Sequence, residues 1–321
     1  MGWVSGLKRQ QCRARLMCQG RRCLSSVIEV FDRSLKKKQK DKADRTGYFD
    51  YLRDEVARRI VGRIQDVKRE FPVCIDIGCG HGHIAKHLSL QGGSVKNLVQ
   101  VDSSLQTVLY NQRTQSKHNA DLRLHNICAD EEFIPFQAGS ADLVVSSLSL
   151  NWVNDLVSCL TQIRTILKPD GAFIAAFLGG DTLQELRSAF AVADLERSGG
   201  LSPHISPMVS SQDAGSLLQE SGFVIPTVDN DRITCMYPDM FTLMEHLTAM
   251  GECNVSLGRR PFVSRDIFLA AAAAYEAMYA NEDGLIPATF NIIYMIGWSP
   301  DPEHQHQPLK RGSAKASLRD I

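Results

Sequence analysis

Residues 76–82 read Asp-Ile-Gly-Cys-Gly-His-Gly, and this stretch decides the fold. It follows the apolar run Val73-Cys74-Ile75, which predicts a buried strand that ends in glycines. Glycines at the end of a strand let the backbone turn tightly and approach a ligand closely. A dinucleotide-binding loop has the spacing G-x-G-x-x-G, whereas here the third glycine comes one residue early and His83 takes its place. The stretch therefore predicts a ligand-binding loop of another kind.

Short β-rich runs alternate with helical stretches along the rest of the chain. We predict strands at 73–77, 97–101, 123–128, 142–147, 172–177, 223–236 and 291–298. We predict helices at 82–90, 104–116, 156–167 (capped by Asn154), 181–197, 211–221, 238–251 and 264–280, with an earlier helical stripe at Leu52, Val56, Ile60 and Ile64. This alternation indicates βαβ units and a parallel sheet. The helical segment at about 238–282 precedes the last strand and is long enough to cap a site at the strand ends.

Charge is balanced over the chain, with 36 basic and 36 acidic residues, which does not favour a nucleic-acid partner. Residues 1–28 are the exception, because they contain six Lys and Arg and no acidic residue. This composition predicts a mitochondrial presequence. The alternative is an unstructured basic N-terminus that carries no targeting signal. We expect a helical lead-in at 29–70, in which the charged run 32–45 is a solvated segment or an exposed helix. The main domain then spans 71–298, and the polar, Pro-containing tail 299–321 is predicted to be disordered.

Two carboxylates follow the glycine loop at strand ends. Asp102 ends the second predicted strand, where it could accept hydrogen bonds from ribose hydroxyls or cap the next helix. Asp130 follows the third. With the Lys168-Pro169-Asp170-Gly171 turn, this order resembles S-adenosylmethionine-dependent methyltransferases. The resemblance implies a Rossmann-like class I methyltransferase fold with a seven-stranded, mostly parallel sheet. It also implies S-adenosyl-L-methionine as cofactor, bound by Asp76, Gly78, Gly80, Gly82, Asp102 and, near the adenine, Asp130.

Longer strings narrow the resemblance, among them FDYLRDEVARRI at 49–60, DLVVSSLSLNWVNDL at 142–156 and MFTLMEHLTAMGE at 240–252. They resemble a family of mitochondrial assembly factors of NADH:ubiquinone oxidoreductase (complex I), whose nearest relatives in fold are O-methyltransferases of biotin precursor synthesis. The resemblance implies a matrix protein, peripheral to the inner membrane, that acts with other assembly factors early in complex I assembly. It also implies hydroxylation of an arginine on a complex I subunit. The chain departs from the family at His81, where Arg is commoner, and at Asn151, which replaces a His.

Three functions are compatible with the sequence: methyl transfer, hydroxylation, and the role of a non-catalytic assembly factor. Methyl transfer to a protein or a small molecule needs mainly orientation, which supplies about 7–11 kcal/mol. Hydroxylation needs an activated oxidant, and a non-haem iron site would use two His and a carboxylate. No His-x-Asp or His-x-Glu pair occurs, so we predict no metal site. Candidate catalytic residues are Asn151, Trp152, Asp181 and His204. Candidate carboxylates for an acceptor arginine are Asp181, Glu185 and Glu252.

Overall fold

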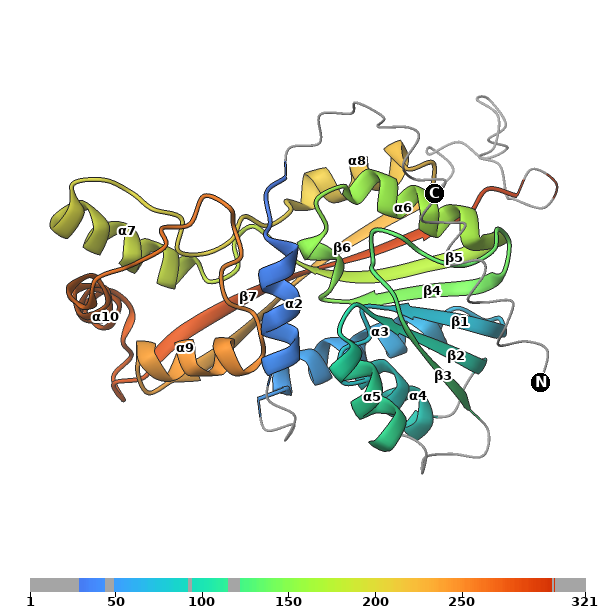
Figure 1. The fold of residues 1–321 in the computed structure, drawn as a ribbon, viewed down its shortest axis with the longest axis horizontal. Coiled ribbons are helices and arrows are strands. Elements are labelled where there is room, and N and C mark those ends of the chain that lie inside the picture. The colour runs from blue at the N-terminus through green and yellow to red at the C-terminus, as the bar shows by residue number, and fades with distance from the viewer. Residues whose placement is uncertain (1–28, 44–48, 92–93, 115–121, 302, 304–321) are drawn as a thin grey trace, which may run out of the picture.

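The computed structural model describes residues 29–43, 49–91, 94–114, 122–301 and 303. Seven strands form one sheet in the order β3-β2-β1-β4-β5-β7-β6 (Figure 1). The strands are β1 (Phe71–Ile77), β2 (Val95–Asp102), β3 (Arg123–Cys128), β4 (Ala141–Ser147), β5 (Leu167–Leu178), β6 (Val224–Tyr237) and β7 (Ile286–Trp298). The first five pair in parallel, and β7 runs antiparallel between β5 and β6. The predicted fold class is confirmed.

The helices lie on both faces of the sheet and at one end of it. They are α2 (Arg33–Lys42), α3 (Tyr51–Asp66), α4 (His83–Gln91), α5 (Leu105–Thr114), α6 (Leu156–Ile166), α7 (Gln184–Ser198), α8 (Ser211–Glu220), α9 (Met240–Ala249) and α10 (Arg265–Tyr279). One core contains α3 and α4, and a second core on the other face contains α6 and α8 (Figure 1). The stripe predicted for α3 is buried throughout, so burial of this face stabilises the helix against the sheet.

The cap forms where the long strands β6 and β7 extend past the rest of the sheet (Figure 1). Its helices α9 and α10 fall within the predicted segment, and α7 packs against α10 as a third member. Leu243 of α9 and Tyr275 of α10 are fully buried in the same core as α3. The cap is therefore continuous with the sheet's own core.

Two expectations need correction. The charged run at 32–45 does form a helix, α2, but it is not simply solvated, because the Lys36 side chain is buried. The cap of α6 is Asp155, whose carboxylate accepts a hydrogen bond from the Ser158 amide. Asn154 instead accepts from the amides of Val30 and Phe31, and so anchors the segment before α2.

The terminal predictions lie largely outside the described residues. The predicted presequence at 1–28 falls wholly outside them, and of the predicted tail only residues 299–301 and 303 are described. Among the helices that are described, none has the length and apolar character to cross a lipid bilayer.

Leu243→Ala tests whether the cap shares the core of the domain. We expect a loss of about 2–5 kcal/mol in the free energy of unfolding, because a fully buried leucine leaves a cavity. Phe241→Ala on the same helix is the control, since that side chain is 47% exposed, and should change stability by less than about 1 kcal/mol. Urea unfolding followed by circular dichroism measures both. Equal effects would contradict the shared core.

Candidate cofactor and acceptor site

The glycine loop joins β1 to α4 at the carboxyl edge of the sheet. Gly78, Gly80 and Gly82 all have positive φ, at 72°, 52° and 77°. A Cβ at Gly78 would lie 1.9 Å from the Ser149 Oγ, so no larger residue fits there without a shift of the β4 loop. The loop therefore depends on glycine for both backbone conformation and close approach.

Asp102 organises this loop from the end of β2. Its fully buried carboxylate accepts hydrogen bonds from the amides of Gly80 (3.2 Å) and Ser104 (2.8 Å). The Thr107 amide in the first turn of α5 donates to the Ser104 hydroxyl instead. Asp102 also lines the pocket formed by the glycine loop. It is thus placed to face a bound ligand rather than to cap the helix.

Asp76 lies directly beneath the loop, fully buried in β1. Neither carboxylate oxygen has a hydrogen-bond partner among the described residues. Burial, reinforced by the nearby negative charge of Asp102, raises the pKa of Asp76 from 3.8 to about 8. The protonated form of Asp76 is therefore favoured at neutral pH, and Asp76 does not line the pocket.

Two lysines of α2 occupy the pocket. The Lys40 Nζ lies 3.5 Å from an Asp102 oxygen and 2.7 Å from a Glu131 oxygen. Burial opposes the charge of Lys40, but attraction to these two carboxylates raises its pKa. The free volume left in the pocket is about 30 Å³, far below the roughly 300 Å³ of a typical ligand site. The loop and Asp102 fit an adenosyl group chemically, and Lys36 and Lys40 fill the space beside them.

Glu131 takes the inward place next to the position that we assigned to Asp130. Asp130 is 47% exposed and pairs with Arg33 at 2.7 Å, whereas Glu131 is 3% exposed and pairs with both Arg33 and Lys40. Sequence reasoning assigned Asp130 and not Glu131, because the direction of each side chain is set by the turn after β3, which the sequence does not show.

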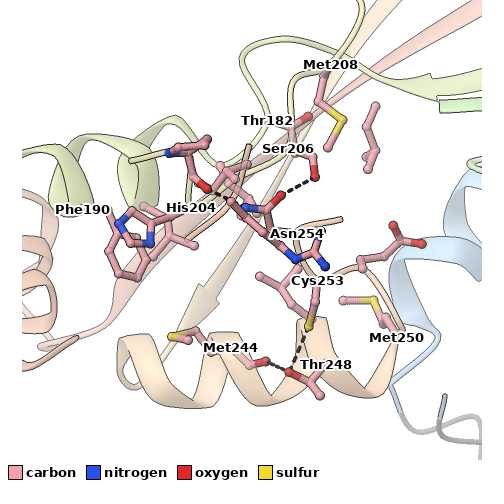
Figure 2. A pocket seen from close by; sticks show the side chains of 18 of the residues that line it. Thr182, Phe190, His204, Ser206, Met208, Met244, Thr248, Met250, Cys253 and Asn254 are labelled. Carbon is pink, nitrogen blue, oxygen red and sulfur yellow. Dashed lines mark hydrogen bonds between the residues drawn. The ribbon is translucent and has the colours of Figure 1, made fainter. Parts of the chain in front are cut away.

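A second cavity of about 280 Å³ lies between the sheet and the cap (Figure 2). Apolar side chains line most of it, including Phe190, Met244 and Met250, and His204 and Thr182 add polar groups. The cavity shares three lining residues with the cofactor pocket: Arg53, Leu148 and Glu252. The two pockets therefore meet at these residues, which is the arrangement that group transfer between a cofactor and an acceptor requires.

A buried cation site stands at this junction. The Lys36 Nζ lies 2.9 Å from a Glu252 carboxylate oxygen, donates to the Gly251 carbonyl at 2.8 Å and sits 3.8 Å from the centroid of the Trp152 ring. Arg53 pairs with the other oxygen of Glu252. Burial lowers the pKa of Lys36 to about 8, although Glu252 opposes that shift. The site thus combines a carboxylate, a carbonyl and an aromatic face around one cation.

Comparisons with known proteins agree with this geometry. Residues 75–175 match the family described as a methyltransferase domain. A protein of Danio rerio named arginine-hydroxylase NDUFAF5, mitochondrial, is 48% identical over 297 residues, covering 92% of this chain and 90% of the relative. The Homo sapiens protein of the same name is 47% identical over 298 residues, covering 92% and 84%. The chain belongs to the NDUFAF5 family.

More distant relatives are methyltransferases. A malonyl-[acyl-carrier protein] O-methyltransferase of Methylovorus sp. is 32% identical over 254 residues, covering 78% of this chain and 82% of that protein. The solved structure of a putative methyltransferase from Bacillus halodurans superposes with a TM-score of 0.53 at 14% identity, covering 77% of this chain and 100% of that one. That likeness shows the shared fold. The NDUFAF5 family is thus built on the methyltransferase fold.

In this member of the NDUFAF5 family, some of the candidate catalytic residues line the second cavity and others do not. Trp152 and His204 line the second cavity, which is the candidate acceptor cavity, and His204 stacks on Phe190 while its Nε2 lies 3.0 Å from Asp194. Asn151 is buried, accepts a hydrogen bond from the Leu178 amide at 3.2 Å and does not line the cavity.

The three candidate acceptor carboxylates are also separated. Asp181 is 59% exposed, 3.6 Å from Arg232, and lies outside the cavity lining. Glu185 is buried and accepts hydrogen bonds from the amide and the hydroxyl of Thr289, so it serves the packing of α7 on β7. Glu252 lies at the junction of the two pockets. Its partners Lys36 and Arg53 were not predicted from the sequence. They lie far from Glu252 in the chain, and their sequence context is typical of charged surface residues.

Gly78→Ala and Gly80→Ala separate close approach from backbone strain. Both glycines have positive φ, but a Cβ at Gly80 meets nothing within 4 Å. We expect Gly80→Ala to cost about 1–2 kcal/mol of unfolding free energy, from backbone strain alone. Gly78→Ala should cost more and weaken ligand binding further, because it also displaces Ser149. Urea unfolding and calorimetric titration with S-adenosylhomocysteine measure the two effects. Equal costs would show that the loop relaxes around Gly78.

Asp76→Asn tests the raised pKa of this buried carboxyl. A group whose folded pKa exceeds its unfolded value loses its stabilising contribution as pH rises, here between pH 4 and pH 8. Wild type should therefore lose up to about 1.4 kcal/mol per pH unit relative to Asp76→Asn across this window, and nothing more above it. Urea unfolding at half-unit pH steps, without added cofactor, measures the difference. A difference independent of pH would mean that Asp76 is ionised throughout.

Proposed function

We propose that this protein binds S-adenosyl-L-methionine in the glycine-loop pocket and hydroxylates an arginine of a complex I subunit. The support for the reaction is the name of the family to which the chain belongs, and the support for the cofactor is the methyltransferase fold. We place this activity in the mitochondrial matrix, at the matrix face of the inner membrane. There the protein acts with other assembly factors early in complex I assembly.

The cation site at the junction of the two pockets is the observation that carries the proposal. A guanidinium pairs well with a carboxylate and stacks well on an aromatic ring. Glu252 and Trp152 offer these two groups at the inner end of an otherwise apolar cavity, which suits the aliphatic stem of an arginine. The Lys36 ammonium already pairs with Glu252 and lies over Trp152. An acceptor guanidinium would take the place of this ammonium, with a shift of α2.

The same shift of α2 opens the cofactor pocket, because Lys36 and Lys40 lie on one helix. Asp102 would then accept hydrogen bonds from the ribose hydroxyls in place of Lys40, and the glycine loop would allow the backbone to approach the nucleoside. The bound cofactor would supply a sulfonium centre, and the oxygen atom of the hydroxylated arginine would come from an external oxidant such as dioxygen, together with a reductant. Leu148 lines both pockets, and residues of the cap line the second one.

Methyl transfer is the second candidate function. The observation in its favour is the junction itself, because transfer from a sulfonium requires chiefly that acceptor and cofactor be held side by side. The relationship to an O-methyltransferase at 32% identity also favours it. The two reactions leave different marks on the acceptor, since hydroxylation adds one oxygen atom and methylation adds one carbon with its hydrogens.

Mass spectrometry of complex I subunits tests the proposal in cells that lack the protein and are complemented with variants. We expect an arginine-containing peptide to lose one oxygen atom in the null cells and regain it with wild type. Glu252→Gln should lower the modified fraction about tenfold or more, because a charge-assisted pair to guanidinium contributes about 1.5–3 kcal/mol. Glu245→Gln is the matched control, since Glu245 lies on α9 with its side chain exposed.

Three other outcomes would contradict the proposal. A lost methyl group instead of a lost oxygen would assign ordinary methyl transfer. Failure of complex I assembly with no altered peptide would assign a non-catalytic role. Full modification by Asp102→Asn, in a protein that no longer binds S-adenosylmethionine by calorimetry, would remove the cofactor from the reaction.

A further inference from the structure

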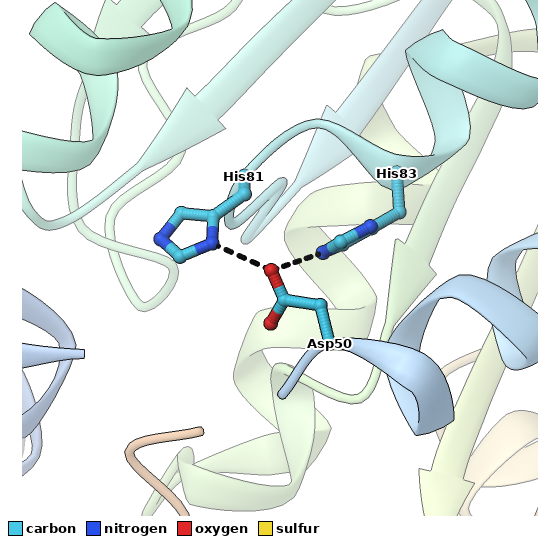
Figure 3. Close-up of side chains that lie close together, drawn as sticks. All are labelled: Asp50, His81 and His83. Carbon is cyan, nitrogen blue, oxygen red and sulfur yellow. Dashed lines mark hydrogen bonds and ion pairs between the residues drawn. The ribbon is translucent and has the colours of Figure 1, made fainter. Parts of the chain in front are cut away.

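Two histidines and an aspartate that are separated in the sequence meet beside the glycine loop (Figure 3). Asp50 immediately precedes α3, His81 stands between two glycines of the loop, and His83 is the first residue of α4. The ligand atoms of all three side chains lie within 4.8 Å of one another. Sequence spacing did not predict the cluster, because Asp50 and His81 are 31 positions apart.

The distances suit a single ion between the three side chains. The His81 Nδ1 is 2.9 Å from the Asp50 Oδ2, and the His83 Nε2 is 3.4 Å from the same oxygen. Nitrogen and carboxylate oxygen bind divalent transition metals at about 2.0–2.2 Å, which places neighbouring ligand atoms about 3 Å apart. In Figure 3 the two imidazole rings each direct a nitrogen at the same carboxylate oxygen of Asp50, so the three ligand groups face one another.

The helix does not use the aspartate for its own stability. Asp50 occupies the N-cap position of α3, where an aspartate usually accepts a hydrogen bond from the helix, yet its side chain makes no such bond. It is 5% exposed and turns toward the histidines instead. The His83 Nε2 is buried, and its partner is the Asp50 Oδ2 at 3.4 Å, which is an ion-pair distance rather than a well-formed hydrogen bond. A metal ion held by both groups would satisfy this nitrogen more fully.

A second carboxylate stands behind the cluster. The Asp54 Oδ1 lies 3.6 Å from the His83 Nδ1, the ring nitrogen that faces away from Asp50. The same oxygen lies 2.7 Å from the Lys86 Nζ and 3.2 Å from the His87 Nε2. Metal-binding histidines usually direct their other nitrogen to a carboxylate, which fixes the ring orientation and makes the ligand nitrogen more basic. Asp54 is placed for this role.

We propose that Asp50, His81 and His83 form a binding site for one divalent transition-metal ion of the kind that imidazole prefers, such as iron(II) or zinc(II). Two histidines and one carboxylate leave coordination positions open, as in the facial triads of non-haem iron proteins. His81 and His83 also line the cofactor pocket, so the ion would lie at its edge. Binding of the metal is a property of the chain itself, independent of the hydroxylation proposed above.

Metal titration of the purified full-length protein tests the site. After chelator treatment and dialysis, we would titrate cobalt(II) and zinc(II) separately by calorimetry, without cofactor or acceptor. We expect one ion per chain, with the affinity reduced about a hundredfold or more in His81→Ala and in Asp50→Asn. His125→Ala is the matched control, because His125 is an exposed histidine of β3 outside the cluster, and it should bind as wild type does.

Thermal unfolding of each variant, with and without the metal, shows whether a loss of metal binding reflects a misfolded protein. Asp50→Asn keeps the volume of the side chain and removes only its charge, so it should retain the fold. Wild type should gain thermal stability on addition of zinc(II), and Asp50→Asn should not. Absence of stoichiometric binding by wild type, or equal affinity in wild type and a folded Asp50→Asn variant, would overturn the proposal. Neither outcome depends on hydroxylase activity, so the two proposals fail separately.

Discussion

Three buried carboxylates at the carboxyl edge of the sheet impose the constraint on which the rest of the site depends. Asp102, Glu131 and Glu252 are withdrawn from water, and an ionised carboxylate in that position is costly unless a cation is close. Helix α2 provides these cations through Lys36 and Lys40, and α3 adds Arg53. The helix before the sheet is therefore held by charge pairing across the site, in a region where apolar contacts alone would not orient it.

This pairing links ligand binding to the position of α2. In the proposed function, a cofactor ribose would compete with Lys40 for Asp102, and an acceptor guanidinium would compete with Lys36 for Glu252. Both ligands would thus pair with carboxylates that lysines of the chain itself neutralise. Since the two lysines are one helical turn apart, displacement of either one favours displacement of the other. The geometry couples the two pockets through one short helix.

The sheet and its helices place the remaining groups with little freedom. Close approach of Gly78 to Ser149 brings the loop after β1 against the loop after β4. Both loops line the cofactor pocket, and Leu148 of the second loop also lines the acceptor cavity. The cap shares its core with the sheet, which fixes Glu252 relative to Trp152. The Asp50, His81 and His83 cluster lies beside the glycine loop, where α3 meets α4.

The sequence by itself determined the strand order along the chain, the glycine loop and the acidic residue after β2, because these depend on local periodicity and on backbone conformations that few residues adopt. It also indicated the cap and the family resemblance. Only the tertiary structure decided which charged residues are buried. Lys36, Lys40, Arg53 and Glu131 resemble surface charges in sequence, and Asp50 resembles a helix cap. Their roles come from contacts between segments far apart in the chain, and the free energy of burying a charge is set by those partners rather than by its sequence neighbours.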